Sequence, residues 1–482
     1  MSSDDLPKGW VTASFGELVR NRDNLRKPIN AKERENRNGD VPYYGAAGQV
    51  GWIDKPIFNE ELLLVGEDGI QFFDPLKPKT YLVSGPAWVN NHAHVLTPLD
   101  NGPLLRYLRY YLDQFDYVGY ANGTTRLKLT RSAMDRIPVR LAPLAEQGRI
   151  VAELEWRLSH VDAAERSLRS ASLRVKMARN ALLHAAVSGE LVPRTSTKES
   201  SDEYRTRLTD ESAKKRERGK WHLISPLDVG DAPDGWSMTT LGRLAWHAGY
   251  GTSEKCTDDK SGVAVLRIPN VRSQEINLRD LKYTPATMVS EDLVLQAHDL
   301  LFIRSNGSRD VIGRAAAAGP GVGSTFASYL IRFRLAADPA LVKWVELVAA
   351  SPSRRQALVE NASSSAGQYN LSIPDLAGMT VPLPEHDELV AIIEEYERRQ
   401  TLIAAAEHAI SQQLRRCATL RRSILATAFS GSLVAQDPND EPAIALLTRI
   451  RDERAAAGQS KTVKKNSTTT PRKPRAKKEP VG

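Results

Sequence analysis

The sequence predicts an α+β protein in which two tandem strand-rich modules are separated by two long antiparallel coiled-coil helices. Three observations support this fold class. An apolar seven-residue spacing is sustained over five repeats, a second copy of that spacing follows 242 residues later, and a Pro-x-Gly-Trp tetrapeptide opens each half of the chain. The 482 residues are therefore expected to form a pseudo-two-fold internal repeat.

The first long helix is predicted over residues 143–192. Large apolar residues recur at every seventh position, and alanine stands three positions after four of them, which favours close approach of a second helix. Gly189 is expected to cap the C-terminal end of this helix. The apolar positions are Leu154, Val161, Leu168, Val175 and Leu182, and the alanines are Ala164, Ala171, Ala178 and Ala185.

The second long helix is predicted over residues 384–434, because residues 179–192 recur as residues 421–434. Heptad spacing that appears twice at one offset favours pairing of the two helices with each other. The alternative is that each helix packs on its own globular module. The matching apolar row is Tyr396, Ile403, Ile410, Cys417 and Ile424, and the expected second row is Ala406, Gln413, Leu420 and Thr427.

The two modules are predicted over residues 1–142 and 233–383, and we call them the first and second modules. Trp10 and Trp236 follow the turn that opens each one and are expected to anchor its core. Strands are predicted within residues 61–69 and 88–96, and a short helix over residues 104–115. In the second module, residues 299–307, 341–350 and 367–371 are matched to residues 61–69, 104–115 and 123–127.

A charged segment follows each long helix. A charged helical linker is expected over residues 193–232 and an amphipathic helix over residues 435–457, with Pro442 in its first turn. Residues 458–482 contain eight Lys or Arg and one Glu, so they supply +7 of the formal net charge of +8. We expect this basic tail to be disordered. It either adds sequence-independent affinity for phosphates or is only a solvated end.

Composition excludes several classes of protein. No apolar run reaches the ~18 residues of a membrane span, and the polar, acidic N-terminus does not fit a secretory signal. The two cysteines, Cys256 and Cys417, are too few for a disulfide framework or a zinc site. We therefore expect a cytoplasmic protein without a membrane partner.

The chain resembles the specificity subunit of Type I restriction–modification enzymes. The residues that carry the resemblance are 143–147 running into 149–151, the helix ends at 185–191 and 428–433, and the two Pro-x-Gly-Trp openings. It covers about residues 6–456, and only the start of the second helix, Pro-Glu-His-Asp-Glu at 384–388, departs from the pattern. The two copies of the helix-end motif at one offset make the match specific.

The resemblance implies that each module is a target recognition domain reading half of a split, asymmetric sequence in double-stranded DNA. It implies that the paired helices dock two methyltransferase subunits, which methylate adenine at N6, and that a motor-nuclease subunit joins for cleavage. It further implies that this chain binds no cofactor, and that S-adenosylmethionine, ATP and Mg are bound by the partner subunits.

No convincing catalytic site or metal site is found in the sequence. Residues 319–325 are glycine-rich but lack the lysine of a phosphate-binding loop, so they are interpreted as a turn. His92 and His94, two apart on an expected strand, would share one face, but a metal needs further ligands. Packing or DNA contact is the simpler interpretation. Glu67 and Asp68 lack the following lysine of nuclease sites and are interpreted as part of a turn.

The candidate DNA-binding residues are loop residues whose side chains can reach base edges or phosphates. They are Tyr43, Tyr44, Arg126 and Lys128 in the first module, and Arg267, Arg304, Asn306, Arg309, Gln368, Tyr369 and Asn370 in the second. Two other hypotheses remain open. One is a non-catalytic coiled-coil scaffold with two ligand- or protein-binding modules, and the other is an enzyme that uses residues 319–325. Neither explains why the long helix is duplicated.

Overall fold

The computed structural model describes residues 6–99, 103–194, 199–216, 220–227, 232–321, 323–365 and 367–466. The chain forms two compact units, Met1–Arg169 with Ser411–Gly482, and Ser170–Ile410. The boundary between the units crosses both long helices, so each unit contains one module and one end of each helix. Within the described residues, none of the helices combines the length and the apolar character that a membrane crossing requires.

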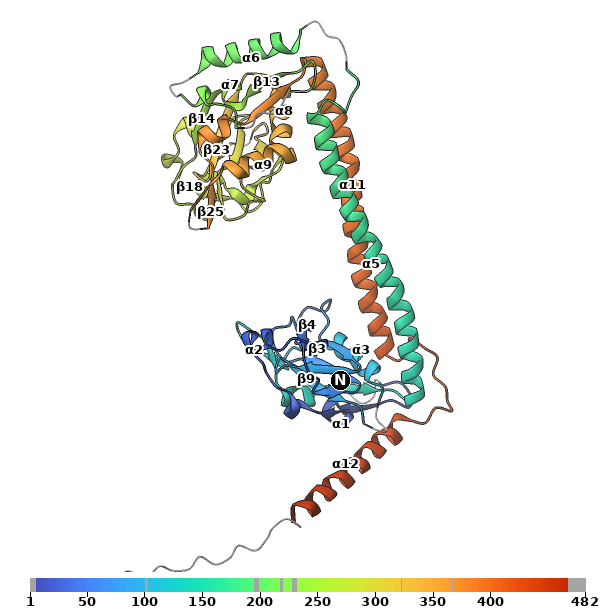
Figure 1. The fold of residues 1–482 in the computed structure, drawn as a ribbon. Helices are drawn as coiled ribbons and strands as arrows, with labels where there is room; N and C mark the ends of the chain where they lie inside the picture. The colour runs from blue at the N-terminus through green and yellow to red at the C-terminus, as the bar shows by residue number, and fades with distance from the viewer. Residues whose placement is uncertain are drawn as a thin grey trace, which may run out of the picture. The chain divides into compact units, whose positions relative to one another are not determined.

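The core of the first module is an antiparallel sheet of order β2-β9-β6-β7. Every residue of β6 and β9 is buried, because the sheet is covered on both faces. The helix predicted over residues 104–115 is α3 (Leu105–Gln114), which packs on this sheet (Figure 1). The strands are β2 (Arg20–Asn21), β6 (Leu62–Gly66), β7 (Thr80–Val83) and β9 (Ala93–Thr97).

A second sheet of order β4-β3-β8-β5 completes this module. The single strand expected within residues 88–96 is wrong, because the run divides into β8 and β9. Asn90 accepts a hydrogen bond from the His92 backbone N–H at 2.8 Å, which forms the turn between them. The strands are β3 (Val41–Gly45), β4 (Gly48–Ile53), β5 (Phe58–Asn59) and β8 (Pro86–Val89), and short elements are α1 (Phe15–Leu18), α2 (Ala31–Glu35), β10 (Ala121–Asn122), β11 (Lys128–Leu129) and α4 (Arg131–Asp135).

The second module repeats the core sheet with the order β14-β23-β19-β21. The helix α8 (Pro339–Ala350) packs on it as expected for residues 341–350. A second sheet, β18-β15-β22, repeats the antiparallel and parallel pairings of β4-β3-β8 in the first module, and β20-β25-β24 is a further small sheet. The strands are β14 (Ala245–Tyr250), β15 (Val263–Leu266), β16 (Val271–Arg272), β17 (Glu275–Ile276), β18 (Lys282–Thr284), β19 (Leu300–Ile303), β20 (Ser305–Asn306), β21 (Ala315–Ala317), β22 (Thr325–Phe326), β23 (Leu330–Leu335), β24 (Ser363–Ser365) and β25 (Gln368–Asn370), and the helices are α7 (Leu241–Leu244), α9 (Pro352–Asn361) and α10 (Ile373–Ala377).

Each module is closed by pairing between the strand after its opening turn and the strand before its long helix. In the first module β1 (Val11–Ser14) pairs with β12 (Pro138–Leu141), and in the second β13 (Ser237–Thr240) pairs with β26 (Thr380–Leu383). The anchoring tryptophans confirm the repeat. The indole of Trp10 donates to Glu146 at 3.0 Å, and that of Trp236 donates to Glu388 at 3.1 Å. Both carboxylates are buried in the first turns of the long helices.

The long helices are α5 (Leu144–Val187) and α11 (His386–Phe429), and they pair antiparallel (Figure 1). In the first unit, Leu154 and Val161 of α5 share a core with Ile424 and Ala428 of α11. In the second unit, Leu182 of α5 and Tyr396 of α11 share another core. The predicted apolar row is therefore buried at both of its ends, and its middle residues, Leu168, Val175, Ile403, Ile410 and Cys417, are half-buried.

The predicted second row of the pairing face is wrong at four of its eight positions. Ala164, Ala178, Gln413 and Leu420 are exposed, whereas Ala171, Ala185, Ala406 and Thr427 are half-buried, and a further inward row lies one position later. That row carries Leu158, Glu165, Arg179 and Ala186 in α5 and Gln400, Glu407, Leu414, Arg421 and Ala428 in α11. The prediction failed because it assigned charges to the outer face. Here charges of the inner row form ion pairs between the helices, Arg179 with Glu407 at 2.7 Å and Arg421 with Glu165 at 3.6 Å. The nearer partner of Arg421 is Asp162, which lies outside that row.

The two helix ends have the same cap. Gly189 (φ +75°) and Gly431 (φ +80°) occupy the left-handed region, which confirms the predicted role of Gly189. Each glycine touches the opening turn of a module in its own unit. A Cβ at Gly189 would lie 3.1 Å from the Trp236 ring, and one at Gly431 would lie 2.2 Å from Pro7 Cγ. Thus the end of the first helix contacts the second module, and the end of the second helix contacts the first module.

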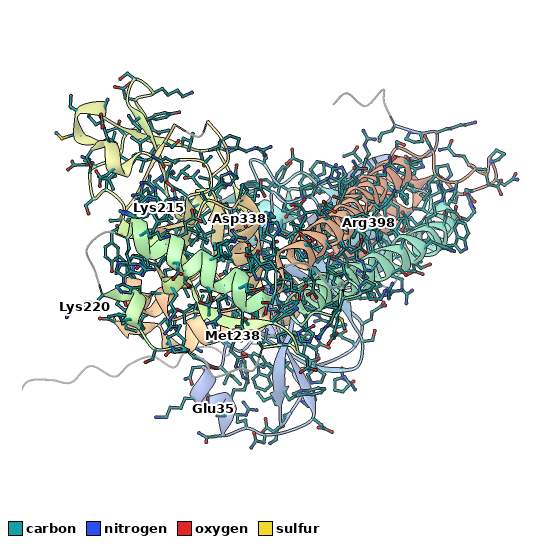
Figure 2. The ribbon with its side chains drawn as sticks, turned by 90° about the horizontal axis from the view of Figure 1, so that it is seen from above. Glu35, Lys215, Lys220, Met238, Asp338 and Arg398 are labelled. Carbon is teal, nitrogen blue, oxygen red and sulfur yellow. The ribbon has the colours of Figure 1, made fainter. Side chains whose placement is uncertain are left out.

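The charged segments form helices that pack on the modules. The helix α6 (Ser201–Lys215) lies on the second module, where Tyr204 donates to Asp338 at 2.7 Å (Figure 2). The helix α12 (Ala443–Asn466) lies on the first module, where the N–H of Ala443 donates to the Gly9 carbonyl at 2.8 Å. The predicted start of the disordered tail at 458 is wrong for residues 458–466, which are helical, because no proline interrupts the chain before Pro471. Residues 467–482 lie outside the described residues.

Candidate nucleic-acid interfaces

The second module has a small polar sheet that collects most of the predicted DNA-binding residues. Strand β25 lies between β20 and β24, with Asn306 opposite Tyr369 and Ser364 also opposite Tyr369. Its side chains are hydroxyls, amides and one aromatic ring, and Ser363, Ser364, Ser365 and Gln368 are exposed. Such groups can donate to and accept from base edges and phosphates. Asn306, Gln368, Tyr369 and Asn370 were predicted from the sequence, but the serine run was not, although its three consecutive hydroxyls are visible in the sequence.

Two predicted arginines flank this polar sheet. Arg309 is exposed, donates from Nε to the Tyr369 hydroxyl at 3.0 Å, and lies over the Tyr369 ring. Arg304 donates to the Leu371 carbonyl at 3.2 Å and stacks on Tyr250, which the sequence analysis missed. Both guanidinium groups are thus fixed by an aromatic ring and one hydrogen bond, an arrangement that limits the conformational entropy they lose on binding.

Arg355 of α9 holds the loop that carries Arg309 by hydrogen bonds to its backbone. This guanidinium donates to the carbonyls of Ile312, Asp310 (3.1 Å) and Arg309 (3.4 Å). Burial lowers the pKa of Arg355 to about 10. Arg355 therefore stays charged at neutral pH and serves as a structural clamp for the loop.

Arg267 does not belong to the polar sheet. It precedes a short 3-10 turn (Ile268–Asn270), where its guanidinium donates to the Asp280 carbonyl at 2.8 Å and its Nε atom is buried. These bonds join two loops of the second module. We therefore assign Arg267 a structural role in place of the predicted DNA contact.

In the first module, the corresponding place is the hairpin of β10 and β11. The N–H of Leu129 donates to the Glu67 carbonyl at 2.8 Å, as that of Leu371 donates to the Arg304 carbonyl at 2.8 Å. Leu129 is therefore equivalent to Leu371, and the sequence match of residues 367–371 to 123–127 is wrong by two positions. The sequence match aligned Gly123 with Gly367. The first hairpin has a longer turn, so its glycine lies two residues further from the equivalent leucine.

The exposed basic residues of this hairpin are paired with acids. Lys128 lies 3.0 Å from Glu67, and Arg126 lies 2.6 Å from Asp68. Glu67 also binds Arg26 at 2.6 Å. Burial raises the pKa of Glu67, but the hydrogen bonds from Arg26 and Lys128 outweigh it, and the net shift is downward. The carboxylates that the sequence analysis assigned to a simple turn therefore hold the cations of the hairpin in place.

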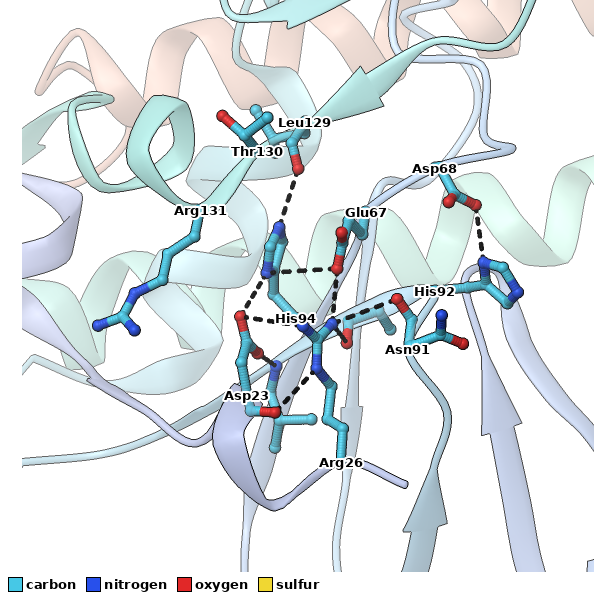
Figure 3. Close-up of polar contacts among 12 residues, drawn as sticks. Asp23, Arg26, Glu67, Asp68, Asn91, His92, His94, Leu129, Thr130 and Arg131 are labelled. Atoms are coloured by element: carbon cyan, nitrogen blue, oxygen red, sulfur yellow. Dashed lines mark hydrogen bonds and ion pairs between the residues drawn. The ribbon is translucent and has the colours of Figure 1, made fainter. Parts of the chain in front are cut away.

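The two histidines of the 92–94 run have separate partners and do not share one face (Figure 3). His94 is 1% exposed and lies between Asp23 (2.7 Å) and the Leu129 carbonyl (2.9 Å). His92 precedes strand β9, is half-buried, and contacts Asp68 at 2.9 Å. Among the described residues no group of three or more His, Cys, Asp or Glu could hold a metal ion.

The two predicted tyrosines of the first module are not loop residues. Tyr43 is 1% exposed and lies in the core of β3, so it is withdrawn as a DNA contact. Alternation along the strand explains this result, because Val41, Tyr43 and Gly45 face inward. Tyr44 faces the other way, is half-buried, and packs against Tyr81 with ring centroids 5.9 Å apart.

Comparisons with known proteins agree with these observations. A family model described as Type I restriction modification DNA specificity domain matches residues 7–161. The chain is 28% identical over 500 residues to the Type I restriction enzyme EcoKI specificity subunit of Escherichia coli (strain K12), covering 97% of this chain and 100% of that protein. It is also 28% identical over 499 residues to the Type I restriction enzyme StySPI specificity subunit of Salmonella potsdam, with 97% and 100% covered.

A solved structure, described as the structural basis underlying complex assembly and conformational transition of the type I R-M system, has the same fold. It matches with a TM-score of 0.59 at 16% identity and covers 89% of this chain and 99% of that one. The two related modules, the paired long helices and these full-length similarities support one conclusion. The chain is similar over nearly its whole length to specificity subunits of Type I restriction–modification enzymes, and its residues 7–161 match the DNA specificity domain of that family.

Proposed function

We propose that this specificity subunit reads a split, asymmetric DNA sequence, with one half read by each module. The supporting observation is that both modules place a hairpin at the same register, at Leu129 and Leu371, but present different side chains there. The first hairpin carries Arg126 and Lys128 paired with acids, and the second carries amides, hydroxyls and Tyr369. Since base identity is read by the donor and acceptor pattern of such groups, the two halves of the site should differ in sequence.

The paired helices α5 and α11 would dock two methyltransferase subunits, one for each copy of the repeat. A repeated surface binds repeated partners. The reaction would be methylation of adenine at N6, with S-adenosylmethionine bound by those partners. ATP and Mg would be used by a motor-nuclease subunit that adds cleavage. This chain itself would supply no catalytic group, and the complex would act in the cytoplasm, where it meets the chromosome.

The experiment is base-resolution mapping of methylated adenines in cells with and without this chain, followed by exchange of residues 10–140 for those of a relative. We expect a split site that disappears with the chain, and an exchange that alters one half of that site only. Methylation that does not depend on the chain, or an exchange that alters both halves, would contradict the proposal. Retained partner binding without any DNA preference would favour the scaffold alternative.

A further inference from the structure

Arg126 sits in a cradle that fixes its guanidinium while leaving it largely exposed. Its Nη2 atom donates to Asp68 Oδ1 at 2.6 Å, and the side chain of Arg126 is 59% exposed. Asp68 is 16% exposed and is fixed in turn, because its Oδ1 atom also contacts His92 Nδ1 at 2.9 Å. The backbone of Asp68 forms a bridge with Lys128, which ties the carboxylate to the same hairpin.

Two glycines complete the cradle. Gly69 has φ +72°, and a Cβ there would lie 2.9 Å from the Nη2 atom of Arg126, so the missing side chain leaves room for the guanidinium. Gly123 has φ +139°, and a Cβ there would lie 2.2 Å from the carbonyl oxygen of Arg126. The turn therefore brings the Arg126 backbone close to Gly123. Both the backbone and the side chain of Arg126 are therefore held.

The Arg126 guanidinium keeps hydrogen-bond donors that are available to a ligand. Asp68 accepts from one hydrogen of the Arg126 Nη2 atom, and the Nε and Nη1 atoms have no hydrogen-bond partner among the described residues. One two-donor edge of the guanidinium, formed by the second Nη2 hydrogen with Nη1 or Nε, therefore stays available. Guanine alone among the bases presents two acceptors, N7 and O6, in the major groove, and a planar guanidinium edge matches that pair. A phosphate can accept from the same edge, but such a contact carries no base preference, so the two contacts differ in whether one base preference or all binding falls when Arg126 is changed.

We propose that Arg126 reads a guanine in the half-site of the first module and that Asp68 is the positioning residue that sets this preference. This inference rests on the proposed function and adds the base that one half of the site must contain. His92 supports Asp68 from the other side and does not itself read the base. In the second module the position equivalent to Arg126 carries Gln368 and the position equivalent to Asp68 carries Ser305, so this module has no such cradle and should not share the preference.

The test uses the complete complex with its methyltransferase subunits and a DNA library randomised in the first half-site. In the wild type, one position of that half should require guanine. Arg126→Lys keeps the charge but loses the two-donor edge, so the guanine preference at that position should fall about 5- to 150-fold, the range for one bidentate contact. Every other position, including the whole second half, should keep its preference.

Variants of Asp68 separate positioning from folding. Asp68→Ala should weaken the same single preference, and Asp68→Asn, which keeps an oxygen acceptor, should weaken it less. The matched control is Arg106→Gln, which removes another exposed arginine of the same unit, one paired with Glu155 on the helix surface. It should leave all base preferences unchanged. Melting temperatures of the variants should match that of the wild type.

Three results would overturn the inference. Arg126→Lys could retain the guanine preference, Asp68→Ala could behave as the wild type, or Arg126→Lys could lower methylation equally for all sequences. If the wild-type complex methylates no split site, the proposed function fails and the inference falls with it. If the wild type recognises a split site and the variants leave its first half unchanged, only the inference falls.

Discussion

Arg179 of α5 and Glu407 of α11 form an ion pair of 2.7 Å on the inner row of the helix pair, and Arg421 and Glu165 occupy the equivalent positions in the other unit. Arg179 and Arg421 are 242 residues apart, as are Glu165 and Glu407. The internal repeat therefore preserves a polar contact inside the helix interface as well as the apolar one. Opposite charges at this row favour one register of antiparallel pairing over shifted registers, in which like charges would meet.

We expect charge reversal to test this register. Arg179→Glu would place two carboxylates together and lower the free energy of unfolding, whereas the double variant Arg179→Glu with Glu407→Arg should recover most of the loss. Both side chains are more than a third exposed, so the coupling energy should be below about 1 kcal/mol. A double-mutant cycle by thermal unfolding measures it, and a coupling of zero would contradict the assigned role of the pair.

The geometry of the two helix caps predicts that replacing their glycines by alanine lowers the free energy of unfolding by different amounts. Gly431→Ala should destabilise the protein by about 1–2 kcal/mol through its left-handed backbone alone, with a further cost from contact with Pro7. Gly189→Ala should cost less, because its Cβ would lie 3.1 Å from the Trp236 ring, a milder crowding than the 2.2 Å approach at Gly431. Gly148→Ala is the matched control. It lies inside α5 with no atom within 4 Å of a Cβ, so the change should be neutral or stabilising.

The ranking of these three variants is read from chemical denaturation midpoints. Equal costs for Gly148 and Gly431 would show that the caps do not matter for stability. A cost at Gly189 above that at Gly431 would contradict the contact distances on which the prediction depends.

The buried glutamates of the helix starts predict a pH effect. Burial raises the pKa of both Glu146 and Glu388, an effect that the indole hydrogen bonds reduce without reversing. A carboxyl with a raised pKa binds its proton more tightly in the folded state. Stability contributed by the protonated form is therefore present at low pH and lost as pH rises through the raised pKa. Glu146→Gln and Glu388→Gln keep an acceptor for the indole and should each raise the melting temperature at pH 7.

That gain should shrink as the pH is lowered toward the ordinary pKa of glutamate, because the wild-type side chain is then protonated too. Thermal unfolding between pH 4 and pH 8 measures the difference. Glu153→Gln on the outer face of α5 is the control and should show no such pH-dependent gain. A stabilisation by Glu146→Gln that stays constant over this range would contradict the burial argument.

The contacts of Arg355 predict that its loss changes base preference in the second half-site only. Arg355→Met should release the carbonyls of Arg309, Asp310 and Ile312, and with them the position of Arg309 over Tyr369. We expect the base preferences of the second half-site to weaken several-fold while those of the first half stay unchanged. Gln356→Ala, an exposed neighbour on α9, is the control and should change neither half. Methylation mapping on randomised DNA measures both halves, and equal weakening of the two would contradict a local clamp.

The sequence by itself determined the repeat, the long helices and their caps. Heptad spacing and glycine after a helix depend on local geometry, and a copy at one offset makes each signal visible twice. The same logic predicted the helices at 104–115 and 341–350, since amphipathic spacing needs no knowledge of distant residues. Even here the second row of the pairing face was only partly predicted, because Glu165 and Arg179 look like surface residues until their partners across the interface are known.

Only the tertiary structure decided which of the candidate DNA-binding residues are exposed and lie together. Tyr43 and Tyr44 are neighbours in sequence, yet strand alternation buries the first and leaves the second half-exposed. Asp68 and Arg126 are separated by 58 residues, and their contact arises from the pairing of a hairpin with the end of β6. Contacts of this kind depend on sheet register, which a single sequence does not encode at any one position, whereas the helix pattern is encoded at every seventh residue.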